Sequence, residues 1–389
     1  MAGAGWRQFT VGQLLTSAQV QTFLQDQAVQ VFASAAARTS ALGTAVSAGM
    51  VSYRADDRAL ELYAGSAWQP VMAGKNAIIN GGFDIWQRGT TFNNLSASYV
   101  ADRWQIGFKD GTHTLNITQQ TFTPGTAPVS GYEGQFYIRL NTSAYTSGTH
   151  YFGQKVEDVR SFAGQTVTLS YWARTSSGTV TPIRVFCAQT FGSGGSSEVD
   201  NIGAQAPTYT TTWTRFTQTI NIPSISGKTI GSSSFLNVLW QFTPAGVQTV
   251  DIWGVQLEAG SVATPFVRAA TTLQGELAAC QRYYTRFTAD NGVNFGGHGG
   301  CVTATIGQSN FPLPVTMRVN PTSIDFANVS WYNYGNGVLY NSGSFVLQAG
   351  QTNYPLIRYT HGSSIFTAGQ SGVFVSNATG GFIGFNAEL

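Results

Sequence analysis

The chain has 389 residues, with 20 basic and 18 acidic side chains and a formal net charge of +2. Only 10% of its residues are charged, against about 25% in an ordinary globular domain, whereas 13% are aromatic. A hydrophobic content of 42% excludes a disordered chain, and the four lysines are too scattered for a groove that follows a phosphate backbone. This composition predicts burial of surface between copies of the chain, or a surface of hydroxyl and amide groups, and no nucleic-acid partner.

The amino-terminal stretch MAGAGWRQFT lacks an apolar core of signal-peptide length, and nowhere do 18 apolar residues follow one another. We therefore expect folding in a cytosol and no membrane insertion. Three cysteines without CxxC spacing argue against a disulfide framework and a zinc site. Cys187, Cys280 and Cys301 are predicted to be small buried thiols.

Residues 12–38 carry the strongest helical pattern, and Thr16 followed by Gln19 fits a capping box. Residues at spacings of four, three and four predict a coiled-coil seam that joins copies of the chain. The seam consists of Val20, Leu24, Gln27 and Val31. A single amphipathic helix explains the pattern equally well. Its docking residues would be Phe23, Val29 and Phe32.

The segment from Met50 to Trp68 predicts a small β-module. Met50–Tyr53 and Ala59–Tyr63 alternate around the turn ADDR, and Tyr53, Tyr63 and Trp68 are its expected aromatic core. Such a module is too small to bury a core alone, so we expect it to trimerise or to dock on another protein.

Residues 75–270 predict an antiparallel β-sandwich, because strands of period two alternate with loops rich in Gly, Ser and Thr. Three predicted strand faces are Val167, Leu169, Tyr171 and Ala173; Leu236, Val238, Trp240 and Phe242; and Asp251, Trp253, Val255 and Leu257. GELAACQRYY then predicts a short helix, and residues 271–389 are again β-rich, which predicts a second, sandwich-like domain.

Two stretches carry a family resemblance: INGGFDIWQRGTTF (79–92) with YVADRW behind it, and DIWGVQLEAGSVATPF (251–266) leading into GELAACQRYY. Together they resemble bacteriophage tail fibre and receptor-binding proteins. The resemblance implies a mainly β protein with three parts. Residues 1–74 would attach to the virion, 75–270 would form a jelly roll similar to carbohydrate-binding modules, and 271–389 would form the tip.

The resemblance to jelly-roll modules also implies a calcium ion near the first and last strands. Asp84, Asp102 and Asp251 would supply carboxylate ligands, since calcium requires six to eight oxygen atoms. The alternative is that Asp84 and Asp102 pair with Arg88 and Arg103 and satisfy buried charge locally.

No arrangement predicts catalysis. Cleavage of a polysaccharide needs two opposed carboxylates, but neighbouring acids such as Glu157 and Asp158 point to opposite faces of a strand. The four histidines are dispersed, and no nucleophile elbow is present. We therefore expect the protein not to be an enzyme.

The segment WYNYGNGVLYN is the best candidate for sugar binding, because aromatic rings stack on sugars and amides bond their hydroxyls. The candidate residues are Trp331, Tyr332, Tyr334, Asn336 and Tyr340. An alternating strand would instead bury half of these rings in the core.

We therefore expect a homotrimeric tail fibre of the virion that contacts tail or baseplate proteins through its N-terminal part and binds host-surface glycan. The rivals are a structural capsid fibre, neck fibre or decoration protein without glycan binding, and a polysaccharide depolymerase.

Overall fold

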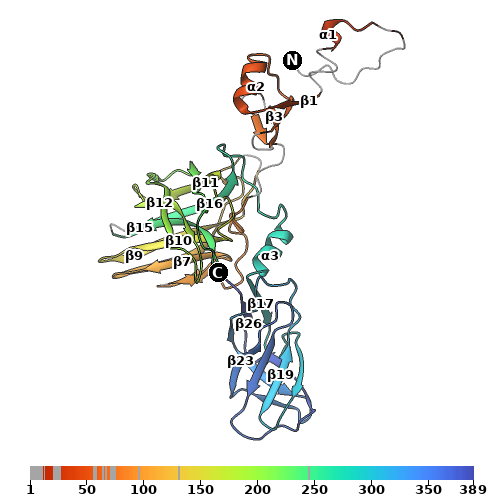
Figure 1. Cartoon of the computed structure of the whole chain (residues 1–389). Coiled ribbons are helices and arrows are strands. Elements are labelled where there is room, and N and C mark those ends of the chain that lie inside the picture. Colours follow the sequence, from red (N-terminus) through yellow and green to blue (C-terminus); the bar gives the residue numbers. More distant parts are fainter. Residues whose placement is uncertain are drawn as a thin grey trace. The chain divides into compact units, whose positions relative to one another are not determined.

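The computed structural model describes residues 12, 14–20, 28–55, 59–63, 65, 68–70, 76–94, 97–129, 132–243 and 246–389. The chain divides into two compact units, one of residues 1–75 with 262–267 and one of residues 76–261 with 268–389. Strands dominate both, which confirms the predicted mainly β class (Figure 1). Within the described residues, no helix is long and apolar enough to cross a membrane.

The first unit contains a four-stranded sheet of order β1-β2-β3-β4 and two short helices. Its elements are α1 Ser17–Val20, β1 Val29–Phe32, α2 Ala35–Leu42, β2 Val51–Arg54, β3 Ala59–Tyr63 and β4 Trp68–Pro70. The β2–β3 hairpin confirms the strands predicted around ADDR. The capping box is also confirmed, because Gln19 N donates to Thr16 Oγ1 at 3.2 Å and Thr16 N to Gln19 Oε1 at 3.1 Å.

The prediction of a continuous helical seam is wrong at Val31. This residue lies in β1 and pairs with Tyr53 of β2 in a parallel ladder, whereas Val20 ends α1. Leu24 and Gln27 lie outside the described residues. The alternation and β-branched valines of VQVF suit a strand, and pairing with β2 outweighs a helical spacing of four.

A buried arginine holds the first unit together, which the sequence did not suggest. Arg38 of α2 forms an ion pair with Glu61, donates to Ser52 Oγ at 2.9 Å and lies 4.2 Å from the centroid of the Trp68 ring. Trp68 also packs against Tyr63, with ring centroids 5.4 Å apart.

The second unit begins with the predicted jelly-roll sandwich of two six-stranded antiparallel sheets. The front sheet consists of β14 Thr214–Asn221, β11 Thr166–Thr175, β16 Gln248–Ala259, β9 Phe136–Tyr145, β8 His113–Thr121 and β5 Thr91–Phe92, in that order. The back sheet consists of β13 Val199–Gln205, β12 Arg184–Thr190, β15 Phe235–Phe242, β10 His150–Glu157, β7 Trp104–Lys109 and β6 Ser98–Tyr99. The predicted faces of β11 and β15 are both confirmed as core, and Tyr171 of one meets Trp240 of the other with ring centroids 5.1 Å apart.

The predicted face of β16 is wrong in its first half. Val255 and Leu257 lie in the core, but Asp251 and Trp253 do not, since Val250 and Ile252 take the core positions there. Gly254, with φ 64°, lies where the pairing with β11 shifts register. A bulge adds one residue and reverses which side chains face inward.

The opening motif forms a tight turn against β16. Asn80 has φ 60°, and its amide bonds both the N–H and the C=O of Ile85 at 3.0 and 2.8 Å. A Cβ atom on Gly81 would overlap the carbonyl of Val255, so only glycine fits there. Backbone geometry therefore favours Asn80 and requires Gly81.

A second hydrophobic core lies among residues 295–387. α3 Leu273–Gln281 precedes it, and Thr272 caps this predicted helix by accepting from Gly275 N at 3.0 Å. One sheet consists of β17 Tyr284–Ala289, β26 Gly381–Asn386 and β20 Ser323–Ala327. The other consists of β22 Val338–Tyr340, β21 Val329–Asn333, β25 Ser371–Ser376, β18 His298–Cys301, β19 Ile306–Asn310, β24 Leu356–Thr360 and β23 Ser344–Ala349. The first core ends at Leu257 and the second begins at Phe295, and both belong to one compact unit. The domain boundary at residue 270 stays a prediction.

The two motifs of the family resemblance meet through cation–π contacts. The Arg88 guanidinium lies 3.6 Å from the Tyr284 ring centroid, and that of Arg103 lies 3.5 Å from the Tyr283 ring centroid. Both arginines also form ion pairs with Glu388. These motif residues therefore join the sandwich to the second core.

Candidate functional site on the front sheet

Trp331 is not an exposed sugar-binding residue. Its side chain is 0% exposed and stacks on Tyr359 at 6.1 Å between ring centroids, with Phe374 edge-on at 5.1 Å. A Cβ atom on Gly307 or Gly372 would overlap the indole, so the core is shaped around this ring. Trp331 lies on the inward face of β21, as the alternative of alternating burial allowed.

The other four candidates remain near the surface but do not converge on a pocket. Tyr334 is 55% exposed and packs edge-on against Tyr332 at 4.9 Å. Asn336 Nδ2 donates to Tyr340 Oη at 2.8 Å, so this amide stabilises its own hairpin. Two pockets among the described residues of the second core include none of these four side chains.

The three aspartates proposed as calcium ligands are each bonded to arginine or amide groups. Asp84 Oδ2 accepts from Arg268 Nε at 2.8 Å, and Asp102 accepts from the backbone and side chain of Gln87 at 2.6 and 2.8 Å. In the described part of the chain, no group of three or more His, Cys, Asp or Glu residues is placed to hold a metal ion. The carboxylates serve as hydrogen-bond and ion-pair acceptors, so these residues do not fit a calcium site.

Asp251 is the centre of a different arrangement on the front sheet. Strand pairing places Arg139 of β9 and Arg174 of β11 directly beside it, one on each side. Arg139 donates through Nε and Nη2 to the two carboxylate oxygens at 2.7 and 2.9 Å, and Arg174 Nε donates to Oδ2 at 3.0 Å. Asp251 is 0% exposed, whereas each arginine side chain is 29% exposed. The buried carboxylate therefore holds two guanidinium groups at the surface.

Aromatic side chains lie beside Arg174 on the same sheet. Trp213, just before β14, is half-buried, and the Arg174 guanidinium lies 4.8 Å from its ring centroid. Tyr137 meets Trp213 edge-on at 5.3 Å, and its hydroxyl accepts from Arg174 Nη2 at 3.2 Å. Phe122 packs on both rings and fixes them. We call Arg139, Asp251, Arg174 and Trp213 the arginine row.

The charge of the arginine row favours hydrogen-bond donation. The hydrogen bond from Arg139 to Asp251 is the main cause of the raised pKa of Arg139, so this guanidinium stays charged. Two arginines and one aspartate leave one net positive charge. Their bonds to Asp251 and Tyr137 use Nε and Nη2, which leaves Nη1 of both arginines for a ligand. A half-exposed indole beside two guanidinium donors can bind a sugar ring that carries hydroxyl or carboxylate groups.

Arg139, Arg174 and Trp213 were not predicted as site residues from the sequence. A weak signal existed, because Arg174 follows the inward series of β11 by one position and must point outward. The pairing with Arg139 had no local signal, since Arg139 and Asp251 are 112 residues apart.

Neither a protein-family model nor a curated protein matches this chain. Solved structures that are similar include the enzymatically active domain of tailspike protein 4 of bacteriophage CBA120. That likeness has 12% identity and a TM-score of 0.31, and it covers 48% of this chain and 22% of the tailspike chain. This chain thus spans less than a quarter of that protein.

Two carbohydrate-binding modules are also similar. A family 11 module from Clostridium thermocellum, solved with a β-1,3-1,4-mixed-linked tetrasaccharide, has 6% identity, a TM-score of 0.29 and coverage of 45% of this chain and 97% of the module. A module named TmCBM61, solved with β-1,4-galactotriose, has 11% identity, a TM-score of 0.28 and coverage of 48% and 99%. At these TM-scores the likenesses carry no argument about function.

Proposed function

We propose that this protein is a phage tail fibre or receptor-binding protein that recognises glycan on the host surface. The observation that carries the proposal is the arginine row, in which a buried Asp251 holds two half-exposed guanidinium groups beside Trp213. The resemblance of the two sequence motifs to tail fibre proteins supports the virion setting.

The chemistry of the row suits a saccharide. The Trp213 face can stack on the C–H side of a pyranose, and the two Nη1 groups can donate to ring hydroxyls. The net positive charge favours a sugar that carries a carboxylate over a neutral one, because bonds from guanidinium to carboxylate are charge-assisted. Because the row is at a sheet surface, a single site is expected to be weak.

The proposal includes a homotrimer, because three linked sites raise the overall affinity through effective concentration. Residues 1–74 would bind tail or baseplate proteins. Light scattering after gel filtration tests the assembly, and a stable monomer at micromolar concentration would contradict it. Adding a chain without residues 1–74 to fibreless particles tests attachment, since decoration by that truncated chain would place the attachment site elsewhere.

The proposal is binding without cleavage. Hydrolysis of a glycosidic bond requires two free carboxyl groups on opposite sides of the bond. On the front sheet the Asp251 carboxylate is 0% exposed and accepts hydrogen bonds from two arginines, so it does not face a ligand at the surface. The rivals remain a structural fibre and a depolymerase.

The test is incubation of the purified protein with host envelope polysaccharide. Retention of intact polysaccharide supports the proposal, shortened chains indicate a depolymerase, and neither result indicates a structural fibre. Trp213→Ala should weaken retention about threefold to tenfold per site, following the energy scale of aromatic pairs. Tyr334→Ala is the control, because Tyr334 is exposed and its ring contacts Tyr332, which is not part of the arginine row. Equal loss in both variants, or no loss in Trp213→Ala, would contradict the assignment.

A further inference from the structure

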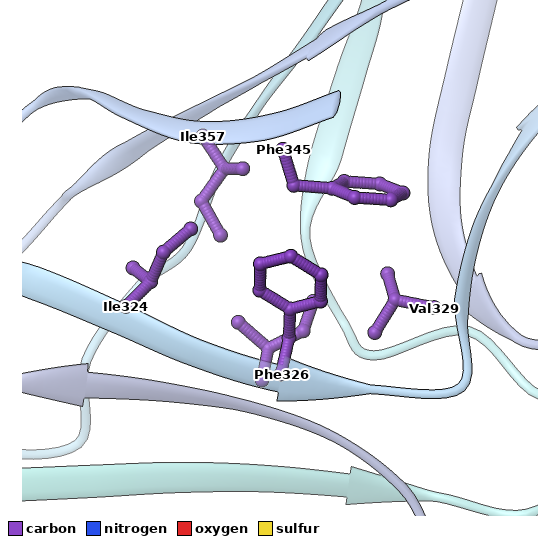
Figure 2. A pocket seen from close by; sticks show the side chains of 6 residues that line it. Ile324, Phe326, Val329, Phe345 and Ile357 are labelled. Carbon is purple, nitrogen blue, oxygen red and sulfur yellow. The ribbon is translucent and has the colours of Figure 1, made fainter. Parts of the chain in front are cut away.

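The second core has a groove that includes no residue of the arginine row. Beneath its floor is a narrow apolar gap with no room for water, lined by Ile324, Phe326, Val329, Phe345, Ile357 and Ile383, as Figure 2 shows. Phe326 comes from β20 and Phe345 from β23, which are edge strands of their two sheets. The ring centroids lie 5.1 Å apart, and Phe326 is 42% exposed. The Phe326 ring is therefore partly open to solvent beside these two edge strands.

A polar rim adjoins this floor. The same groove continues past Phe326 and Phe345 along residues that carry amide, hydroxyl or backbone groups. They are Ala327, Asn328, Asn341, Gly343, Ser344 and Asn377. Not one of the residues that line the floor or the rim is charged. An anionic or cationic ligand would lose water here without gaining a partner of opposite charge, so the lining matches a neutral ligand.

The rim amides are held in position by a buried hydroxyl. Ser330, which is 0% exposed, donates to Asn341 Oδ1 at 2.6 Å and accepts from Asn377 Nδ2 at 2.6 Å. These bonds fix which end of each amide points toward Ser330: Oδ1 of Asn341 and Nδ2 of Asn377. The unbonded ends, Asn341 Nδ2 and Asn377 Oδ1, give the rim one fixed donor and one fixed acceptor.

We propose that this groove is a second glycan site, which takes an uncharged hexose unit. The Phe326 ring stacks on the C–H face of the sugar, while Asn341 donates to one hydroxyl and Asn377 accepts from another. Ser330 is a positioning residue for both amides. The site rests on the proposed function of glycan recognition, but it differs from the arginine row in being uncharged.

The site is tested with the full chain on an array that prints neutral hexose oligosaccharides beside uronate-containing ones. Binding to at least one neutral oligosaccharide is expected. Asn341→Ala and Asn377→Ala should each weaken that binding at least fivefold, and Phe326→Ala should abolish it. Gln348→Ala is the matched control, because Gln348 is an exposed amide on β23 whose side chain alternates away from Phe345. Melting temperatures of all variants are measured on the same preparations.

The outcomes separate the two sites. No neutral oligosaccharide bound, or equal binding by the asparagine variants and Gln348→Ala, would overturn the groove site even if polysaccharide retention still depends on Trp213. Loss of a stable oligomer in Phe326→Ala, with neutral-sugar binding absent in the wild type, would show that a second copy of the chain covers Phe326. Conversely, neutral-sugar binding that depends on Asn341 while host polysaccharide is not retained would support the groove and reject the proposed function of the arginine row.

Discussion

Arg103 and Glu388 form a buried ion pair although 285 residues separate them in the sequence. Glu388 also lies 3.3 Å from Arg88, so one carboxylate neutralises the arginines of both WQRG and ADRW. Because all three side chains are at most 11% exposed, this contact fixes the sandwich against the segment that follows β26.

Glu388→Gln should lower the free energy of unfolding by about 3–5 kcal/mol, since it leaves the buried Arg103 guanidinium without its counter-ion, whereas Arg88 keeps Asp102 at 3.9 Å. Urea unfolding measures it. Asp158→Asn is the control, because its pair with Arg160 at 3.2 Å is largely exposed and should change stability by less than about 1 kcal/mol. Equal effects of the two variants would show that the buried pair is not a major stabilising contact.

Trp331→Ala should destabilise the protein by about 3–5 kcal/mol, because it empties a core position between Tyr359 and Phe374. Thermal unfolding measures the change, and the exposed Tyr334→Ala should leave the melting temperature nearly unaltered. Reduced glycan binding by correctly folded Trp331→Ala protein, with an unchanged melting temperature, would restore the hypothesis that Trp331 binds sugar.

Stability should depend on pH through Asp102. Burial raises its pKa above the usual 3.8, although Arg88 and Gln87 oppose the shift. The folded state therefore binds this proton more tightly than the unfolded chain does. The contribution of Asp102 is most favourable below pH 3.8 and falls as pH rises through the folded pKa. Relative to the wild type, Asp102→Asn should gain stability with rising pH in urea unfolding.

Asp110 supplies a control of opposite sign. Hydrogen bonds from Thr149 lower its pKa, so its contribution is present above pH 3.8 and is lost as pH falls through the folded pKa. Relative to the wild type, Asp110→Asn should lose stability with rising pH. The same slope in the Asp102 and Asp110 variants would contradict the assigned directions.

The three thiols should not react with a thiol reagent in the native protein. Cys187, Cys280 and Cys301 are all free and buried, as predicted from the sequence. Burial raises the pKa of each, and that of Cys187 to about 12, so little reactive thiolate forms at pH 8. Ellman's reagent should detect no thiol before denaturation and three afterwards. Rapid reaction of any one thiol in the folded chain would show that its segment opens easily.

The strands of the sandwich were predictable because alternation along a strand is a local property of the backbone. Val167, Leu169, Tyr171 and Ala173 recur at period two, and the structure places all four in the core. The helical spacing that ends at Val31 wrongly predicted a helix there, because β1 gains its hydrogen bonds from β2, more than 20 residues later.

The candidate sites were much less predictable. The alternation of side chains along a strand predicts that Trp331 and Tyr332 lie on opposite faces. Only the packing of Tyr359 and Phe374 against Trp331 decides that Trp331 faces inward. The bulge at Gly254 likewise moved Asp251 out of the predicted face.

The sequence by itself determined the mainly β class, the succession of strands, the short helix after the sandwich and the chemical nature of the chain, which is poor in charge and rich in aromatic rings. These features depend on local spacing and composition. The tertiary structure alone decided which rings are buried and which charges meet. The partners of Asp251 and Glu388 lie more than 70 residues away, and pairing over such distances is set by sheet order and register, which no local pattern encodes.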